Sequence, residues 1–276
     1  MAIFQSRLGC SSISFRHQDL PTALTTIRGL GFEEIDLGAL PGVCDHVPYV
    51  LDSQSVHAVA TDVLASGLRV RTVNGDIGDL NQQLTDAEQQ SRMDHLDMLL
   101  TLTDAIGGRA LVLPCGAIDH NPVRSLDEDL DLVASQLSAA AQRADAFGIE
   151  VWTESLHFFR LCYNIERAEQ LSQRLAGSGV RLVMDFSHIT ASGSDPRDYV
   201  DRFADQIAHV HLRDAVPGNI HLSVGNGSAD FAGGLRALAE AGYTGHFALE
   251  LETRDISNDE RPEATARAGA FITPLI

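Results

Sequence analysis

The chain has 276 residues, 44% of them hydrophobic, and its 38 acidic against 20 basic side chains give a formal net charge of −18. All of the basic residues are arginines, so the chain contains no lysine. This absence excludes a Schiff-base aldolase, a pyridoxal phosphate enzyme and a Walker-A nucleotide site. The acidic balance argues against nucleic acid as a partner, because phosphate binding draws on basic surface.

The cysteines and the N-terminus indicate a reducing compartment. Cys10, Cys44, Cys115 and Cys162 lie far apart and form no CxxC pair, so we expect free thiols. The opening Met-Ala-Ile-Phe-Gln-Ser-Arg lacks a charged segment followed by an apolar one, and no run approaches the length of a membrane span. We therefore expect a cytoplasmic protein with no membrane partner.

Short apolar runs alternate with longer amphipathic segments along the chain. The predicted strands are residues 8–15, 34–37, 68–74, 110–114, 149–154, 180–185, 207–212 and 246–251. Helical patterns lie between them, among them residues 20–31, 85–106, 126–147 and 165–175. Thr85 and Glu88 have the spacing of a capping box, and Gly148 follows the third of these helices.

This alternation predicts the fold class. Repeated strand–helix units form a parallel sheet, and eight of them usually close a barrel. We therefore predict a single (β/α)8 TIM-barrel domain over residues 1–276. A doubly wound open sheet is the alternative, but Ser-Ser-Ile-Ser-Phe-Arg-His stands where the GxGxxG fingerprint of that fold would follow the first strand.

The fifth to eighth predicted strands each deliver a metal-competent side chain near the same end, and these are Glu154, Asp185, His211 and Glu250. In a barrel this end carries the function. Strand alternation also places His209, His211 and Arg213 on one face.

A cation is the simplest explanation of this group. Buried carboxylates without one would repel each other and raise each other's pKa. Lysine is absent, and Arg213 is the only arginine on these strand tips. Three carboxylates and one imidazole suit Mn²⁺, Mg²⁺ or Co²⁺, with Zn²⁺ as a further choice, and open positions would accept adjacent oxygens of a substrate.

The second half of the chain, residues 149–253, carries stretches that resemble a known family. They are Thr-Glu154-Ser, Met-Asp185-Phe-Ser-His188, His-Val-His211-Leu-Arg-Asp214, Val-Gly225-Asn-Gly227-Ser-Ala-Asp-Phe, and the segment 241–253 with Glu250 and Glu252. Together they resemble the xylose-isomerase-like TIM barrels of the sugar phosphate isomerase/epimerase family, among whose relatives are ketose 3-epimerases and inosose dehydratases.

The resemblance implies one divalent metal, with Mn²⁺ as the first choice, held by Glu154, Asp185, His211 and Glu250. It also implies that Glu154 and Glu250 exchange protons with the substrate carbon, while the metal stabilises an enediolate. His188 and Arg213 then resemble ligands of substrate oxygens. Arg213 stands where many relatives have lysine, which keeps the charge and changes the donor geometry.

Other members of the superfamily fit less well. Endonuclease IV-type repair enzymes carry a longer metal set, which His188 and the Asn-Ile-His221 stretch resemble in part. Asn219, however, replaces an acidic ligand of that set, and Asn74 and Cys115 stand where further histidines are expected. Xylose isomerases proper use a catalytic lysine, and a phosphate-binding signature is missing. We therefore expect an unphosphorylated carbohydrate substrate and no three-metal phosphodiester cleavage.

Further substrate-binding candidates follow from their positions. His46 follows the second strand, Trp152 shares a strand face with the fifth-strand glutamate, and His157 and Arg160 lie in the loop after that strand. His221 is the last of these candidates, because its Asn-Ile-His stretch lies between two of the segments that resemble the family.

These residues predict a metal-dependent isomerase or epimerase of an unphosphorylated sugar, ketose or keto-polyol, acting by proton abstraction through a metal-stabilised enediolate. A lyase or dehydratase on an inosose or 3-keto-glycoside is the alternative, and it would use the same metal site and glutamate base. A barrel kept only for binding is a third, and the intact set of four ligands argues against it. Such barrels often pair into homo-oligomers through their helix faces, but the sequence identifies no interface.

Overall fold

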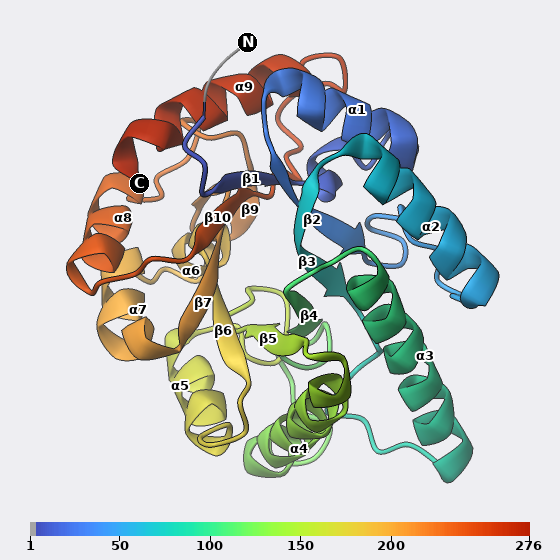
Figure 1. Cartoon of the computed structure of the whole chain (residues 1–276). Helices are drawn as coiled ribbons and strands as arrows, with labels where there is room; N and C mark the ends of the chain where they lie inside the picture. Colours follow the sequence, from blue (N-terminus) through green and yellow to red (C-terminus); the bar gives the residue numbers. More distant parts are fainter. Residues whose placement is uncertain (1–3) are drawn as a thin grey trace.

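The computed structural model describes residues 4–276 and contains a closed barrel of parallel strands surrounded by helices (Figure 1). The barrel strands are β1 (Leu8–Ser11), β2 (Glu34–Ala39), β3 (Arg69–Gly75), β4 (Ala110–Pro114), β5 (Glu150–Glu154), β6 (Arg181–Asp185), β7 (Ile207–Leu212) and β10 (His246–Leu249). Their order around the barrel is β1-β10-β7-β6-β5-β4-β3-β2, and all neighbouring pairs are parallel. The predicted (β/α)8 fold is confirmed.

The helices cover the outside of the barrel. They are α1 (Leu20–Leu30), α2 (Ser53–Ser66), α3 (Asp86–Ala105), α4 (Leu126–Ala144), α5 (Ile165–Arg174), α6 (Phe186–Ala191), α7 (Pro196–Phe203), α8 (Phe231–Glu240) and α9 (Arg261–Ile272). The capping box predicted at the start of α3 forms, since Thr85 and Glu88 each accept a hydrogen bond from the other's backbone N–H. Within residues 4–276, no helix combines the length and the hydropathy needed to span a membrane.

Among the described residues the core has three clusters: a large one between barrel and helices, a smaller one inside the barrel, and a third made of Ala191, Ala215 and Ile220. The cluster inside the barrel consists of Ala110, Val112, Trp152, Val183 and Ala208. The indole of Trp152 is 1% exposed and is the largest of these side chains, so the barrel is a packed core rather than a pore.

Two predicted strands end earlier in the structure than expected. The first ends at Ser11, because its hydroxyl accepts from the backbone N–H of Ile13 and starts a 3₁₀ turn over Ser12–Phe15. In this turn the Ser14 hydroxyl donates to the Leu249 carbonyl at 3.3 Å and accepts from the Leu251 N–H at 2.9 Å. The turn thus covers the end of β10, which stops at Leu249.

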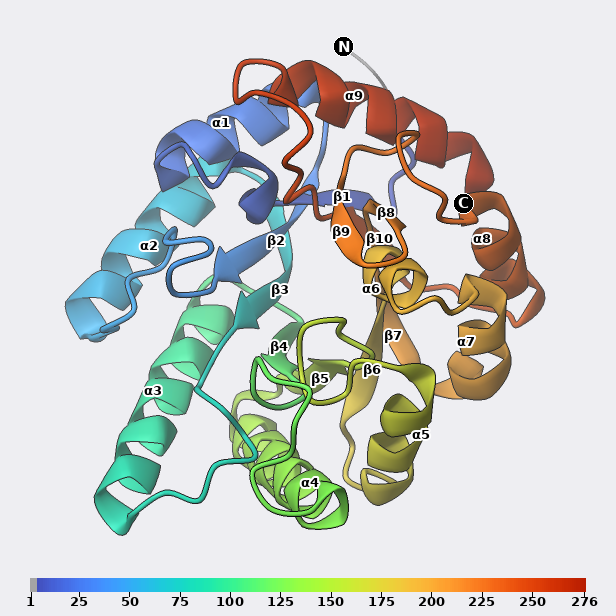
Figure 2. The same cartoon turned by 180° about the vertical axis from the view of Figure 1, so that it is seen from behind.

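A hairpin that the sequence reasoning did not predict follows β7. It consists of β8 (Asp214–Val216) and β9 (Asn219–Leu222), which pair antiparallel at the carboxyl end of the barrel (Figure 2). The carboxylate of Asp214 accepts from the N–H groups of Gly225 and Gly227 at 2.8 and 3.0 Å. A Cβ at position 227 would lie 2.2 Å from Asp214 Oδ1, so the approach requires glycine. These motif residues therefore shape a loop beside the site.

Candidate active site

The four side chains predicted as metal ligands converge at the carboxyl end of the barrel. Glu154 ends β5, Asp185 ends β6, His211 lies in β7 and Glu250 directly follows β10, and these strands are neighbours. One donor atom from each lies within 4.8 Å of the others. All four side chains are buried, with exposed fractions between 0% and 7%. The prediction that these strand-end residues meet is therefore correct, although Glu154 and Glu250 are 96 positions apart in sequence.

The donor set fits a divalent cation. Among the described residues, Glu154 Oε1, Asp185 Oδ2 and His211 Nδ1 are buried without a hydrogen-bond partner. Each such atom costs about 1–3 kcal/mol when nothing binds it. Three carboxylates and one imidazole provide the oxygen-rich, negatively charged environment that Mn²⁺, Mg²⁺, Co²⁺ or Zn²⁺ accepts.

Crowding changes the protonation of this cluster. Burial and the charges of Asp185 and Glu250 raise the pKa of Glu154 well above its usual value. Burial also raises the pKa of Glu250. For His211, burial lowers the pKa, but the carboxylates of Glu250, Asp36 and Glu154 outweigh it and raise the pKa to about 10. Without a cation the cluster holds protons at neutral pH, and a cation would displace them.

A cavity of about 290 Å³ opens over the cluster, a volume that suits a small molecule. Its polar lining includes Asn74, Asp76, Glu154, His157, Arg160, His188, Arg213, His221, Glu250, Glu252 and Arg254. Apolar side chains, including Leu40, Val43, Ile118 and Phe159, line another part. Both glutamates that were predicted to transfer protons thus face the space where a substrate would lie.

His188 presents an N–H group beside Glu154. Its Nδ1 accepts from the backbone N–H of Phe158 at 3.0 Å, so the proton of the neutral ring is on Nε2. That atom lies 3.3 Å from Glu154 Oε1. Burial and the charge of Arg213 lower the pKa of His188 well below its usual value, so the ring is neutral. His188 therefore can donate a hydrogen bond at the cavity.

Arg213 is buried and held from several sides. Its Nε donates to the Ser187 hydroxyl at 3.0 Å, and that hydroxyl donates to Asp185 Oδ1 at 2.6 Å. Its Nη1 lies 3.6 Å from a carboxylate oxygen of Glu252. Since the guanidinium is 1% exposed and tied to these groups, it is a rigid part of the cavity wall.

Two further predicted substrate-binding residues also line the cavity. The ring of His157 lies against that of His188, with centroids 3.8 Å apart. The Nδ1 of His221 lies 3.0 Å from the Glu252 carbonyl, and its ring stacks on Phe159. The loop after β5 and the hairpin thus bring both histidines to the same opening.

His46 and Trp152 lie elsewhere. The ring nitrogens of His46 lie 3.0 Å from the Ser12 hydroxyl and 3.1 Å from the Gln18 carbonyl. Trp152 lies inside the barrel, where its Nε1 donates to Glu150 at 2.7 Å. Neither belongs to the lining of the cavity. Both residues therefore lie outside the proposed substrate pocket.

The sequence reasoning did not identify Asn74 or Asp36 as members of the site. Asn74 Nδ2 donates to Glu250 Oε1 at 3.0 Å, and Asn74 lines the cavity. The available signal was its place at the end of the third predicted strand. The sequence analysis noted Asn74 only as a position where endonuclease IV-type enzymes would have a histidine. Asp36 contacts His209 and His211 inside the barrel, and a lone aspartate in a strand carries no such signal.

Comparison with known proteins agrees with this fold. The family model described as "Xylose isomerase-like TIM barrel" matches residues 26–275. The inosose dehydratase of Geobacillus thermodenitrificans is 26% identical over 152 residues, 49% of this chain and 50% of that protein. The chain spans about a third of the length of the mycobacterial relatives that match it at 34% and 32% identity.

Solved structures resemble the whole barrel. The IolI protein with a binding zinc atom superposes with a TM-score of 0.79 at 16% identity and covers 98% of this chain and 99% of that one. The 3-keto-D-glucoside 4-epimerase YcjR from E. coli gives a TM-score of 0.75 at 19% identity, with 95% and 98% covered. At such identities the likeness shows the fold alone.

Proposed function

Because the chain belongs to the xylose isomerase-like TIM barrel family, we propose that it is a divalent-metal-dependent isomerase or epimerase of an unphosphorylated sugar, ketose or keto-polyol. The observation that carries this proposal is the buried cluster of three carboxylates and one imidazole beneath a small cavity. Mn²⁺ is the first cation to test, since the donor set is rich in oxygen.

Glu154, Asp185, His211 and Glu250 would hold the cation. A divalent cation at this position supplies positive charge that stabilises negative charge developing on substrate oxygens. Glu154 takes the proton from the carbon next to the substrate carbonyl, and Glu250 returns one to the opposite face. Both glutamates line the cavity, which gives each access to the substrate.

The remaining polar groups bind and orient the substrate. The Nε2–H of His188 donates to a substrate oxygen, and the buried guanidinium of Arg213 offers a fixed positive charge beside it. His157 and His221 border the same opening. These donors suit the hydroxyl and carbonyl oxygens of a carbohydrate.

The charges around the cavity support an unphosphorylated substrate. Within the described chain, each arginine that lines the cavity pairs with a carboxylate: Arg160 with Asp76 at 3.0 Å, and Arg213 and Arg254 with Glu252 at 3.6 and 3.5 Å. A phosphate group would have to compete with these carboxylates for the guanidinium groups. A neutral substrate requires no such competition.

A lyase or dehydratase acting on an inosose or a 3-keto-glycoside is the second candidate. The 26% identity to an inosose dehydratase favours it. The first step would be the same proton abstraction by Glu154, and the reaction would then expel a group from the adjacent carbon. The geometry of the site serves both reactions.

The deciding experiment incubates the Mn²⁺-loaded protein in D₂O with ketoses, inososes and 3-keto-glycosides. Deuterium in recovered or epimerised sugar supports the isomerase, whereas loss of water or aglycone supports the lyase. The same protein treated with a chelator is the control and should be inactive. A chain that binds no divalent cation and exchanges no substrate proton would contradict both candidates and favour a non-catalytic barrel.

A further inference from the structure

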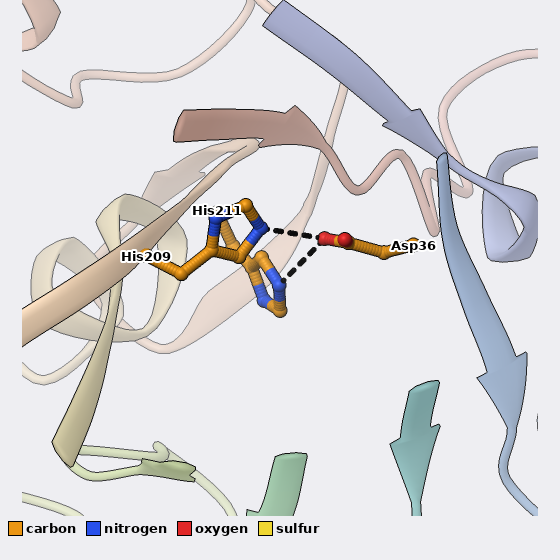
Figure 3. Close-up of side chains that lie close together, drawn as sticks. All are labelled: Asp36, His209 and His211. Carbon is orange, nitrogen blue, oxygen red and sulfur yellow. Dashed lines mark hydrogen bonds and ion pairs between the residues drawn. The ribbon is translucent and has the colours of Figure 1, made fainter. Parts of the chain in front are cut away.

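A buried carboxylate inside the barrel contacts the histidine of the proposed metal site. Asp36 lies on β2, and β1 and β10 stand between it and β7, which carries His209 and His211. Figure 3 shows both imidazole rings turned toward the Asp36 carboxylate. Its Oδ2 lies 2.7 Å from His209 Nε2 and 3.3 Å from His211 Nε2. All three side chains are 0% exposed, so water does not compete for these contacts.

We propose that Asp36 is a positioning residue that turns His211 toward the metal site and selects its ligating nitrogen. His211 Nε2 faces Asp36, and His211 Nδ1 lies 3.6 Å from Glu250 Oε2. A carboxylate beside Nε2 keeps the ring proton on that atom, which leaves the Nδ1 lone pair for a cation. This inference rests on the proposed metal site.

His209 holds Asp36 in place for this task. A carboxylate only accepts, so the 2.7 Å contact is a hydrogen bond donated by His209 Nε2–H. The His209 ring also packs against Trp152 and stands perpendicular to the His211 ring, with centroids 5.8 and 5.2 Å away. Trp152 therefore supports the arrangement from inside the barrel, in a role different from the substrate contact expected of it.

A second metal site is an alternative explanation of this cluster, since Asp36, His209 and His211 offer three donor atoms. The distances favour a hydrogen bond instead. Donors around a Zn²⁺ ion lie about 2 Å from the metal and therefore about 3 Å or more from each other. At 2.7 Å, Asp36 Oδ2 and His209 Nε2 are closer than that. Metal stoichiometry separates the two readings.

The same strand provides a matched control two residues before Asp36. Glu34 Oε1 lies 2.6 Å from His246 Nδ1, so β2 carries two carboxylate–histidine pairs. The Glu34 side chain is 7% exposed, and His246 belongs to no group of candidate metal donors among the residues described. Glu34→Gln therefore disturbs an equivalent pair that does not contact His211.

The test measures Mn²⁺ binding by calorimetry in the wild-type chain, Asp36→Asn, Asp36→Leu and Glu34→Gln. We expect one site per chain, with affinity about 10-fold lower in Asp36→Asn, about 100-fold lower in Asp36→Leu, and unchanged within about twofold in Glu34→Gln. If Asp36→Leu does not fold, Asp36→Asn decides, because it keeps the shape and loses the charge.

A spectroscopic measurement tests the orientation itself. In the Zn²⁺-loaded protein with ¹⁵N-labelled histidine, we expect His211 to carry its proton on Nε2 and its metal on Nδ1, and Asp36→Leu to weaken or reverse this pattern. Folded Asp36 variants that bind as tightly as wild type would overturn the positioning role alone. Two Mn²⁺ ions per chain, one lost with Asp36, would replace it with a second metal site. A wild-type chain that binds no divalent cation would overturn this inference and the proposed function together.

Discussion

One strand carries two glutamates with opposite surroundings. At the amino end of β5, Glu150 pairs with Arg109 and accepts from Trp152 Nε1 at 2.7 Å. Four residues later, Glu154 stands beside Asp185 and Glu250, and its Oε1 is among the buried atoms without a hydrogen-bond partner in residues 4–276. Both side chains share one strand face. A carboxylate with its own cation belongs to the scaffold, and a group of carboxylates without one indicates a binding site.

The positions of the arginines also differ between the amino and carboxyl ends of the barrel. Arg71, Arg109 and Arg181 border the amino end together with Glu150. At the carboxyl end, Arg213 comes no closer than 3.9 Å to Asp185 and lies nearer to Glu252. The protein therefore pairs Glu150 at the amino end with an arginine, whereas the cluster of Glu154, Asp185 and Glu250 at the carboxyl end has no such close partner among the described residues.

The largest expected effect separates the two glutamates directly. Glu154→Gln removes both a metal ligand and the proposed base, so we expect turnover to fall by roughly 10²–10⁴-fold and Mn²⁺ affinity to fall as well. Glu150→Gln should keep turnover and lose less than about 1 kcal/mol of unfolding free energy, because its Arg109 partner is 59% exposed. Deuterium exchange, calorimetry and denaturant unfolding measure the three quantities. Equal turnover in both variants would contradict the assignment of Glu154 to the active site and of Glu150 to the scaffold.

A smaller effect is expected from Asn74. Its amide donates to Glu250 Oε1, and Asn74→Ala removes this bond to a charged group. We expect kcat/KM to fall roughly 10- to 100-fold, which corresponds to about 1.4–2.8 kcal/mol. Steady-state kinetics on the substrate found in the panel measures the change. An unchanged kcat/KM would mean that Glu250 is oriented by its other neighbours.

The last prediction concerns the pH dependence of metal binding, which reports the protons held by the cation-free cluster. The pKa of His211 is raised to about 10, so the cation-free cluster holds a proton at pH 7, and the pKa values of Glu154 and Glu250 are raised as well. Binding must release protons, so affinity for Mn²⁺ should rise as pH rises from 6 to 8, by about tenfold per pH unit for each proton released. Calorimetry in buffers of different ionisation enthalpy counts the protons. Affinity independent of pH would show that the acidic groups are already ionised.

The sequence predicted much of the fold and the convergence of four side chains, Glu154, Asp185, His211 and Glu250, at one end of the barrel. The hydrophobic alternation located each barrel strand, and the strand-end rule identified Glu154 and Asp185 without any tertiary information. It did not reveal the hairpin β8–β9, whose stretch lies beyond the alternating strand–helix units. The sequence analysis expected Trp152 to contact substrate because it shares a strand face with Glu154. Strand alternation shows which side chains point into the barrel, but it does not show whether they lie in its middle or at its opening.

What the sequence determined by itself was local: strand and helix periods, helix caps, and the residue types at strand ends. These follow from backbone geometry and burial within a few residues. Beyond the residues at the strand ends, only the tertiary structure decided which distant groups meet. Asp36 and His209 are 173 positions apart, and Asn74 and Glu250 are 176 apart. Barrel closure brings them together, because β1 joins β10 and places the second strand near the seventh.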